Sequence, residues 1–169
     1  MTTTSTTTST TPTDAGLLVL RLGVGATMAA HGTQKLFGWF DGGGLSGTER
    51  FLATSGYPMA KPFAVVLGLS ETLGGIGLIL GLFTPLAAAA ILGTMLNAIA
   101  FKWGGFFSPK GIEYEVILAV AATCLALTGA GGFALDRFVP GLRNYKLVYG
   151  LAAIALALIA AGIVLLIRN

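Results

Sequence analysis

The chain has 169 residues, of which 54% are hydrophobic and only 10% charged, with a formal net charge of +3. A water-soluble globular protein carries about a quarter of its residues as charges, so this composition excludes that class. The ten basic residues are scattered at the ends of apolar segments, which argues against a nucleic-acid partner. Apolar runs about twenty residues long predict an all-α integral membrane protein rather than a β-barrel.

The N-terminal part consists of a polar tail and a first apolar segment. Residues 1–13 are almost entirely Thr and Ser, and we expect them to be disordered. Residues 15–40 follow, and their part from 15 to about 34 is interpreted as a retained transmembrane helix with Lys35 at the interface. No basic residue precedes this segment and no cleavage site follows it. This segment carries Arg21 and His31. A charge at the depth of Arg21 is costly, so it either locks two helices together or marks a functional site.

A long connection, residues 37–61, links the first and second apolar segments. Ser46 and Glu49 have the spacing of a capping box, in which two side chains satisfy the first backbone amides of a helix. We therefore expect a short amphipathic helix over residues 47–55. It is predicted to lie on the membrane surface with apolar side chains such as Leu52 toward lipid.

Further apolar segments predict transmembrane helices over residues 62–83, 85–101, 112–129 and 147–167. The turn between the first two of these is so short that they must form an antiparallel hairpin. In the last segment, Ala153, Ala157 and Ala161 recur every four residues, which predicts a face that packs against another helix.

Basic residues at the segment ends indicate an orientation. The face of the first loop, the third loop and the C-terminus carries six of them, Lys35, Arg50, Lys61, Lys102, Lys110 and Arg168, against three on the other face, Arg137, Arg143 and Lys146. Because cytoplasmic loops are richer in Lys and Arg, this favours an N-terminus outside the cell.

Helix geometry suggests a buried ion pair. Arg21 lies about six residues (~9 Å) from the start of the first span, and Glu71 about ten residues (~15 Å) from the opposite end of an antiparallel span. Across a ~30 Å hydrocarbon core their Cα atoms then differ in level by about 6 Å. An arginine side chain reaches that far, so the sequence predicts an Arg21–Glu71 pair.

A second polar cluster is expected at the level of the first and third loops, where His31, Asn97, Glu113 and Glu115 arrive on one side of the membrane. Residues two apart on a helix point in nearly opposite directions, so one glutamate faces the bundle. We choose Glu113, with Glu115 as the alternative. His31 beside a carboxylate can shuttle protons or hold a quinone carbonyl, or it is only hydrogen-bonded near the headgroups. One histidine, scattered carboxylates and the single Cys124 predict no metal site.

Several short motifs occur in a characteristic order. They are Leu20-Arg21-Leu22, His31-Gly32, Lys35-Leu36-Phe37-Gly38, Glu71 before Gly74-Gly75, Gly81-Leu82-Phe83-Thr84, Glu113-Tyr114-Glu115 and Leu135-Asp136. In these motifs the chain resembles the DoxX-like membrane proteins over residues 15–138.

The resemblance implies a four-helix core and a bacterial inner-membrane location. For some relatives it implies redox assemblies that pass electrons from sulphur compounds to quinone, and for others oxidative-stress or thiol-homeostasis complexes. The chain departs from the family pattern by a span after Asp136 and by Pro85, where an arginine is usual. We therefore expect a four-helix transmembrane core plus a fifth C-terminal transmembrane helix. The chain is divided into a tail over 1–13, a DoxX-like domain over 14–138, and a linker with the fifth helix over 139–169.

The function that we expect is that of a membrane subunit in a redox complex, active only with a partner. Its polar residues would hold a quinone as co-substrate or a small sulphur-containing substrate. The candidate site residues are Arg21, His31, Lys35, Glu71, Asn97, Glu113 and Glu115. The expected partners are the lipid bilayer and a soluble oxidoreductase or sulphur-handling enzyme. The sequence leaves open whether the chain forms a homo-oligomer. Two alternatives remain: a small transporter in which Glu71 binds a proton or cation, and a structural anchor that recruits a soluble oxidoreductase.

Overall fold

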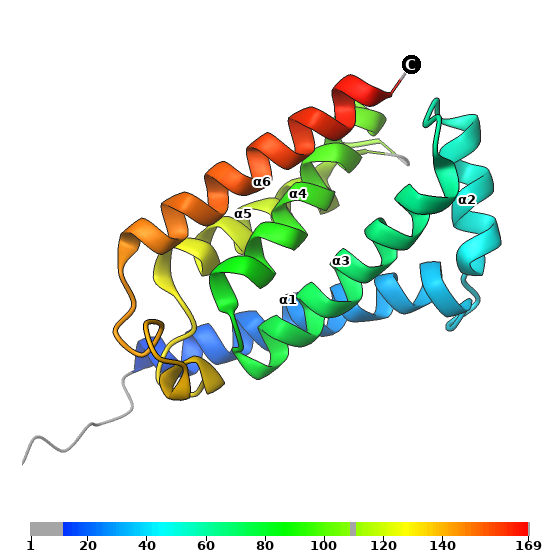
Figure 1. The fold of residues 1–169 in the computed structure, drawn as a ribbon. Coiled ribbons are helices and arrows are strands. Elements are labelled where there is room, and N and C mark those ends of the chain that lie inside the picture. The colour runs from blue at the N-terminus through cyan, green and yellow to red at the C-terminus, as the bar shows by residue number, and fades with distance from the viewer. Residues whose placement is uncertain (1–11, 109–110, 169) are drawn as a thin grey trace, which may run out of the picture.

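The chain folds into an all-helical bundle, which the computed structural model describes over residues 12–108 and 111–168 (Figure 1). The predicted disordered tail falls almost entirely on residues 1–11, outside the described residues. The helices are α1 (Pro12–Phe37), α2 (Gly44–Thr54), α3 (Ala60–Leu80), α4 (Thr84–Lys102), α5 (Glu113–Thr128) and α6 (Leu147–Ile167), with a short 3-10 helix, η1 (Leu135–Phe138), before α6.

Four of these helices, α1, α3, α4 and α6, are long and apolar enough to cross a membrane. The predicted C-terminal span is among them. Of the five predicted spans, α5 is the one that is not among these candidates, because it has only 16 residues. Its length of about 24 Å is less than the ~30 Å hydrocarbon core. An all-α membrane protein is thus confirmed with four candidate spans, and a fifth crossing stays a prediction.

Glycines set the distance between α1 and α3. A Cβ atom on Gly25 of α1 would lie 2.7 Å from the carbonyl oxygen of Gly75 on α3, and a Cβ on Gly75 would lie 2.6 Å from that of Gly25. Further along the pair, Gly32 approaches Gly68 and Thr72 in the same way. Small residues allow two backbones to approach closely in a bilayer. These contacts fix the register of α1 against α3.

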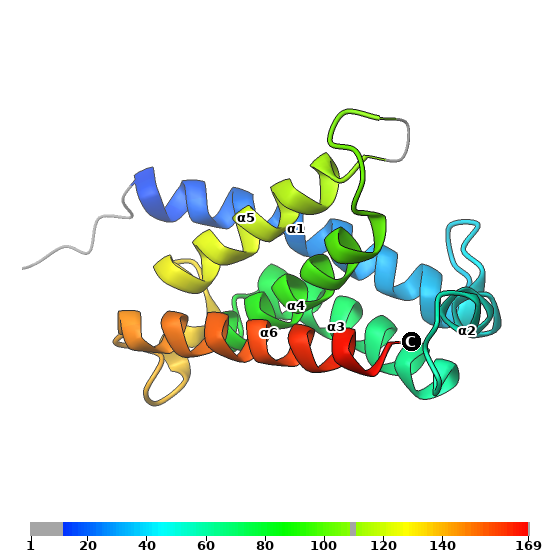
Figure 2. The same ribbon diagram turned by 90° about the horizontal axis from the view of Figure 1, so that it is seen from above.

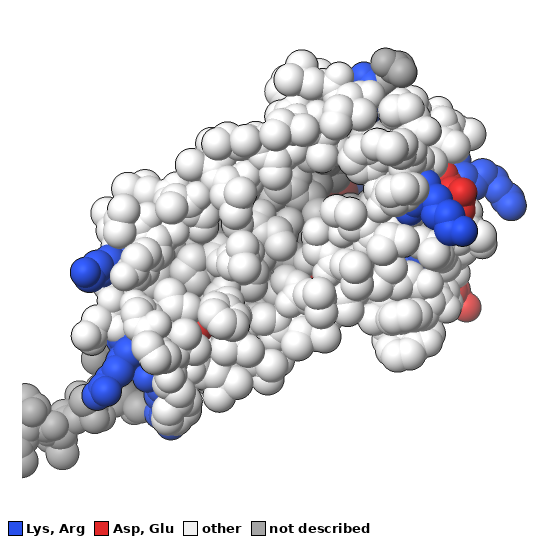
Figure 3. Space-filling model, viewed as in Figure 1, with Lys and Arg blue, Asp and Glu red and all other residues white. Residues whose placement is uncertain are grey.

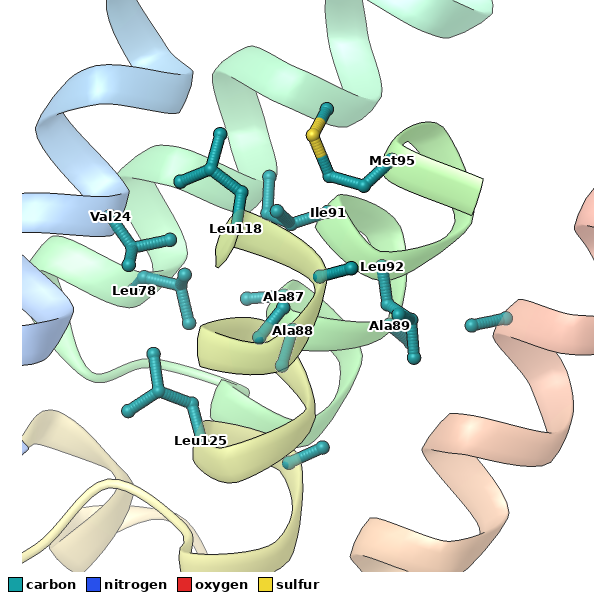
Figure 4. Packing of buried hydrophobic residues seen from close by; sticks show 14 of the residues in the cluster. Val24, Leu78, Ala87, Ala88, Ala89, Ile91, Leu92, Met95, Leu118 and Leu125 are labelled. Carbon is teal, nitrogen blue, oxygen red and sulfur yellow. The ribbon is translucent and has the colours of Figure 1, made fainter. Parts of the chain in front are cut away.

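The core lies where α4 packs against α3, α5 and α6. Leu78, Ile91 and Leu125 are fully buried there and come from α3, α4 and α5 (Figure 4). The predicted small-residue face of α6 is confirmed, because Ala153, Ala157 and Ala161 are its buried alanines. In Figure 2, α1 and α5 lie on one side of the bundle, and α3 and α6 lie on the other.

Helix α2 covers the end of the bundle where α1 finishes and α3 begins (Figure 1). The predicted capping box of Ser46 and Glu49 does not form, because α2 already begins at Gly44 and Ser46 lies inside its first turn. The predicted lipid contact of Leu52 is also wrong. Leu52 is buried in a small cluster with Tyr57, so the apolar face of α2 closes the bundle instead of resting in lipid.

Candidate functional site

A cavity of about 450 Å³ lies near the end covered by α2. Its walls are mostly apolar and include Met28, Phe63 and Val164. Its polar lining comes from α1, α3, α4 and α5 and consists of His31, Lys35, Ser70, Glu71, Thr94, Asn97, Lys102, Tyr114 and Glu115. Ligand pockets commonly combine such apolar walls with a few convergent polar groups.

The first ion pair of the cavity joins α1 to α3. Lys35 Nζ lies 2.6 Å from Glu71 Oε2, and the Glu71 side chain is only 4% exposed. The close approach at Gly32 brings the two residues to the same level. A carboxylate buried this deeply is stable as an anion only with a hydrogen-bonded cation beside it.

The second ion pair joins the end of α4 to the start of α5. Lys102 Nζ lies 2.5 Å from Glu115 Oε1. The other carboxylate oxygen, Glu115 Oε2, is buried and has no hydrogen-bond partner within the described residues. Asn97 Oδ1 is likewise buried without a hydrogen-bond partner within the described residues. The amide nitrogen of Asn97 does have one, since it donates to the carbonyl of Gly93 at 3.0 Å. Both oxygen atoms are acceptors, and each could accept a hydrogen bond from a ligand.

Glu115, and not Glu113, is the glutamate that faces the bundle. Glu115 is buried in line with Leu118, Ala122 and Leu125, which form the apolar stripe of α5. Glu113 lies off this stripe and outside the cavity lining. Our choice of Glu113 was wrong because it ignored the phase that the apolar positions of α5 impose on its first turn.

A chain of hydrogen bonds fixes the tautomer of His31. The Gln34 amide nitrogen donates to the carbonyl of Phe40 at 3.1 Å, which turns Gln34 Oε1 toward His31 Nδ1 at 3.0 Å. His31 Nδ1 must then carry the proton and donate it to Gln34. Neutral His31 Nε2 is left as an acceptor, and the Tyr114 hydroxyl lies 2.8 Å from it. The Tyr114 hydroxyl therefore donates a hydrogen bond to His31.

Arg21 lies outside the cavity, and the predicted Arg21–Glu71 pair is not formed. Arg21 is fully buried near the opposite end of the bundle, where Nη2 donates to the carbonyl of Phe133 at 2.5 Å. Glu71 is paired with Lys35 instead. The close contacts between α1 and α3 place Arg21 beside Gly81, so the assumption that both spans start at the same level was incorrect.

Asp136 completes the surroundings of Arg21. Its carboxylate accepts hydrogen bonds from the backbone amides of Phe83 at 2.6 Å and Thr84 at 2.9 Å, and it stabilises the guanidinium electrostatically. These bonds tie η1 to the tight turn between α3 and α4. Two further guanidinium nitrogens of Arg21, Nε and Nη1, are buried and have no hydrogen-bond partner within the described residues.

The structure thus brings together five of the predicted residues: His31, Lys35, Glu71, Asn97 and Glu115. Sequence reasoning missed Tyr114 and Lys102 as members of the site. Tyr114 was visible between the two glutamates, whereas Lys102 was counted only as an interfacial charge. Within the described ranges, no three His, Cys, Asp or Glu side chains lie close enough to hold a metal ion.

The chain matches the DoxX family over residues 16–104. The chain belongs to the DoxX family. It is 33% identical over 129 residues to "Inner membrane protein YphA" of Escherichia coli (strain K12), which covers 72% of this chain and 88% of the relative. It is 31% identical over 131 residues to "Putative oxidoreductase CatD" of Bacillus subtilis (strain 168). This match covers 76% of this chain and 91% of the relative. No solved structure matches the chain significantly.

The DoxX match defines which part of the cavity belongs to the shared segment. Residues 16–104 include the Lys35–Glu71 pair and His31. Tyr114 and Glu115 lie beyond the matched range. The expected bacterial inner-membrane location agrees with the name of the E. coli relative and with the four candidate spans.

Proposed function

We propose that this DoxX protein is the membrane subunit of a redox complex and that its cavity binds a quinone. The observation that carries the proposal is the combination, in one cavity of about 450 Å³, of apolar walls with the His31–Tyr114 pair and two Lys–Glu pairs. An aromatic head group needs the apolar walls, and its oxygen atoms need the polar ones. The name of the B. subtilis relative, which contains the word oxidoreductase, supports the redox assignment.

The polar wall suits a ligand that gains and loses protons. Reduction of a quinone takes up two electrons and two protons, and oxidation of the hydroquinone returns them. Neutral His31 can take the Tyr114 proton while Tyr114 takes one from a ligand hydroxyl, and protonated His31 can send it back. The buried acceptors Asn97 Oδ1 and Glu115 Oε2 would gain the donors that they lack from a ligand hydroxyl. Electrons would come from a soluble oxidoreductase that handles a sulphur compound.

The test is a titration of the purified protein in nanodiscs with a short-chain quinone. We expect saturable binding. Tyr114→Phe or Lys35→Met should weaken it by about tenfold, the effect of losing one polar contact of about 1.4 kcal/mol. Lys61→Met is the matched control, because Lys61 is exposed and lies outside the cavity lining. Absence of saturable binding by the unaltered protein, or equal binding by all variants while they remain folded, would refute the proposal.

The transporter alternative gains no support from Glu71. Its carboxylate is already neutralised by Lys35, which leaves less attraction for a transported cation. Proton or substrate flux through liposomes that contain this protein alone would reverse that preference, whereas activity that requires a soluble oxidoreductase favours the redox subunit.

A further inference from the structure

The cavity opens on a face of the bundle whose middle is almost entirely uncharged, apart from a little Asp or Glu visible inside the hollow. Figure 3 shows this face hollowed near its centre, with Lys, Arg, Asp and Glu side chains gathered toward the two ends. At the opening, Val66 of α3 is 59% exposed, and Val164 of α6 lines the cavity from the other side. An uncharged belt between two charged ends is the part of a membrane protein that faces the hydrocarbon layer. The mouth of the cavity therefore opens into lipid.

Polar and apolar walls lie at different depths from this mouth. His31, Lys35, Tyr114 and Glu115 come from α1 and α5, which lie behind α3 and α6 in the view of Figure 1. The helices beside the mouth contribute mainly apolar side chains. A molecule that fills the cavity from the lipid side would thus meet the polar groups with its leading end.

The end of the cavity nearest the loops is covered by aromatic contacts. Phe51 of α2 packs edge-on against Phe101 of α4 with 5.2 Å between the ring centroids. The guanidinium of Arg168 lies 5.3 Å from the Phe101 centroid. Phe51 and Phe101 both line the cavity, so their contact joins α2 to α4 at this end of it.

We infer that the ligand enters sideways from the bilayer between α3 and α6 and is an amphipathic molecule with an isoprenoid or other long apolar tail. Its oxygen-bearing head reaches the His31–Tyr114 pair, and its tail leaves between Val66 and Val164 into the acyl chains. This inference rests on the proposed quinone function and adds the route and the tail to it. Because its tail stays in the lipid, the ligand can enter and leave the cavity without crossing water.

The test compares a long-tailed quinone with a tail-less benzoquinone in nanodiscs. Val66→Trp and Val164→Trp narrow the mouth, and Leu73→Trp is the matched control, because Leu73 is 61% exposed on α3 but outside the cavity lining. We expect the mouth variants to slow association of the long-tailed quinone by about tenfold or more and to change tail-less binding much less. Leu73→Trp should change neither.

A second measurement needs no substitution. A quinone with a photoreactive group on the first isoprene unit should label α3 and α6 near Val66 and Val164. Lateral entry would be overturned if the label were found on α2 or on the loop before α5 instead. It would also be overturned if the mouth variants slowed neither quinone, or slowed both equally. Either result would leave quinone binding intact. Failure of the unaltered protein to bind either quinone would refute the proposed function itself.

Discussion

Two buried carboxylates with lysine partners are the main electrostatic feature at the level of single residues. Glu71 and Glu115 are each nearly enclosed, and each has one lysine within 2.6 Å. Their lysines remain partly exposed, so each pair links the interior of the bundle to its polar end. The geometry explains how a membrane protein tolerates charges at this depth, since each carboxylate is neutralised by its own partner.

Removal of one member of the α1–α3 pair should be worse than removal of both. Lys35→Met leaves the Glu71 carboxylate buried without a cation, at a cost of about 3 kcal/mol in the free energy of unfolding. Combination with Glu71→Gln should recover part of that loss. Thermal unfolding in detergent of the two single variants and the double variant gives the coupling energy.

Arg21→Met combined with Glu71→Gln is the control for that cycle. Arg21 contacts Phe133, and Glu71 contacts Lys35, so the two losses should add within about 0.5 kcal/mol. Additive losses for Lys35 and Glu71, or strong coupling between Arg21 and Glu71, would contradict the arrangement described above.

At the level of elements, the close contact of α1 with α3 aligns the site. The glycines of both helices allow the backbones to touch, and the register that follows sets Lys35 beside Glu71 and Arg21 beside Gly81. A shift of one helical turn would separate the ion pair. The site therefore depends on glycines that are not themselves part of it.

Gly75→Ala should destabilise the bundle. The added Cβ would lie 2.6 Å from the Gly25 carbonyl oxygen, so the helices must move apart, at a cost of about 1–3 kcal/mol. Gly23→Ala is the matched control, because nothing lies within 4 Å of a Cβ at that position of α1. Melting temperatures in detergent should fall for Gly75→Ala only. Equal melting temperatures for the two variants would mean that α1 and α3 are less closely packed than described.

Sequence reasoning was strongest for the elements and weakest for their register. The apolar segment at 62–83 corresponds closely to α3 (Ala60–Leu80), because hydropathy follows from composition alone. The partner of Glu71 depends on which glycines of two helices meet, which a linear sequence does not encode locally. Glu115 was within reach of sequence reasoning, since Leu118 and Leu125 already mark the buried side of α5.

For the whole molecule, the path of the chain bears on its membrane topology. In Figure 1 the start of α1 and the end of α6 lie at opposite ends of the bundle, and α5 runs back along α4 between them. An odd number of crossings would put the two termini on opposite sides of the membrane. A fifth crossing, by α5 with its 16 residues, therefore stays a prediction that the positions of the two termini can test.

Fusion reporters at the two termini test the topology. From the distribution of Lys and Arg we expect the N-terminus outside and the C-terminus in the cytoplasm. A phosphatase active only outside should work at the N-terminus, and a fluorescent protein that folds in the cytoplasm should work at the C-terminus. Both termini on the same side would mean that α5 does not cross.

The most direct test of the central claim is the quinone content of the protein itself. The chain should be purified from bacterial membranes in detergent, washed, and extracted for quantification of quinone per mole of protein. We expect an amount that approaches one quinone per chain and falls markedly in the folded variant Tyr114→Phe, with Lys61→Met unchanged. A quinone content no higher than that of an unrelated membrane protein purified in the same way, together with no uptake of added quinone, would contradict it.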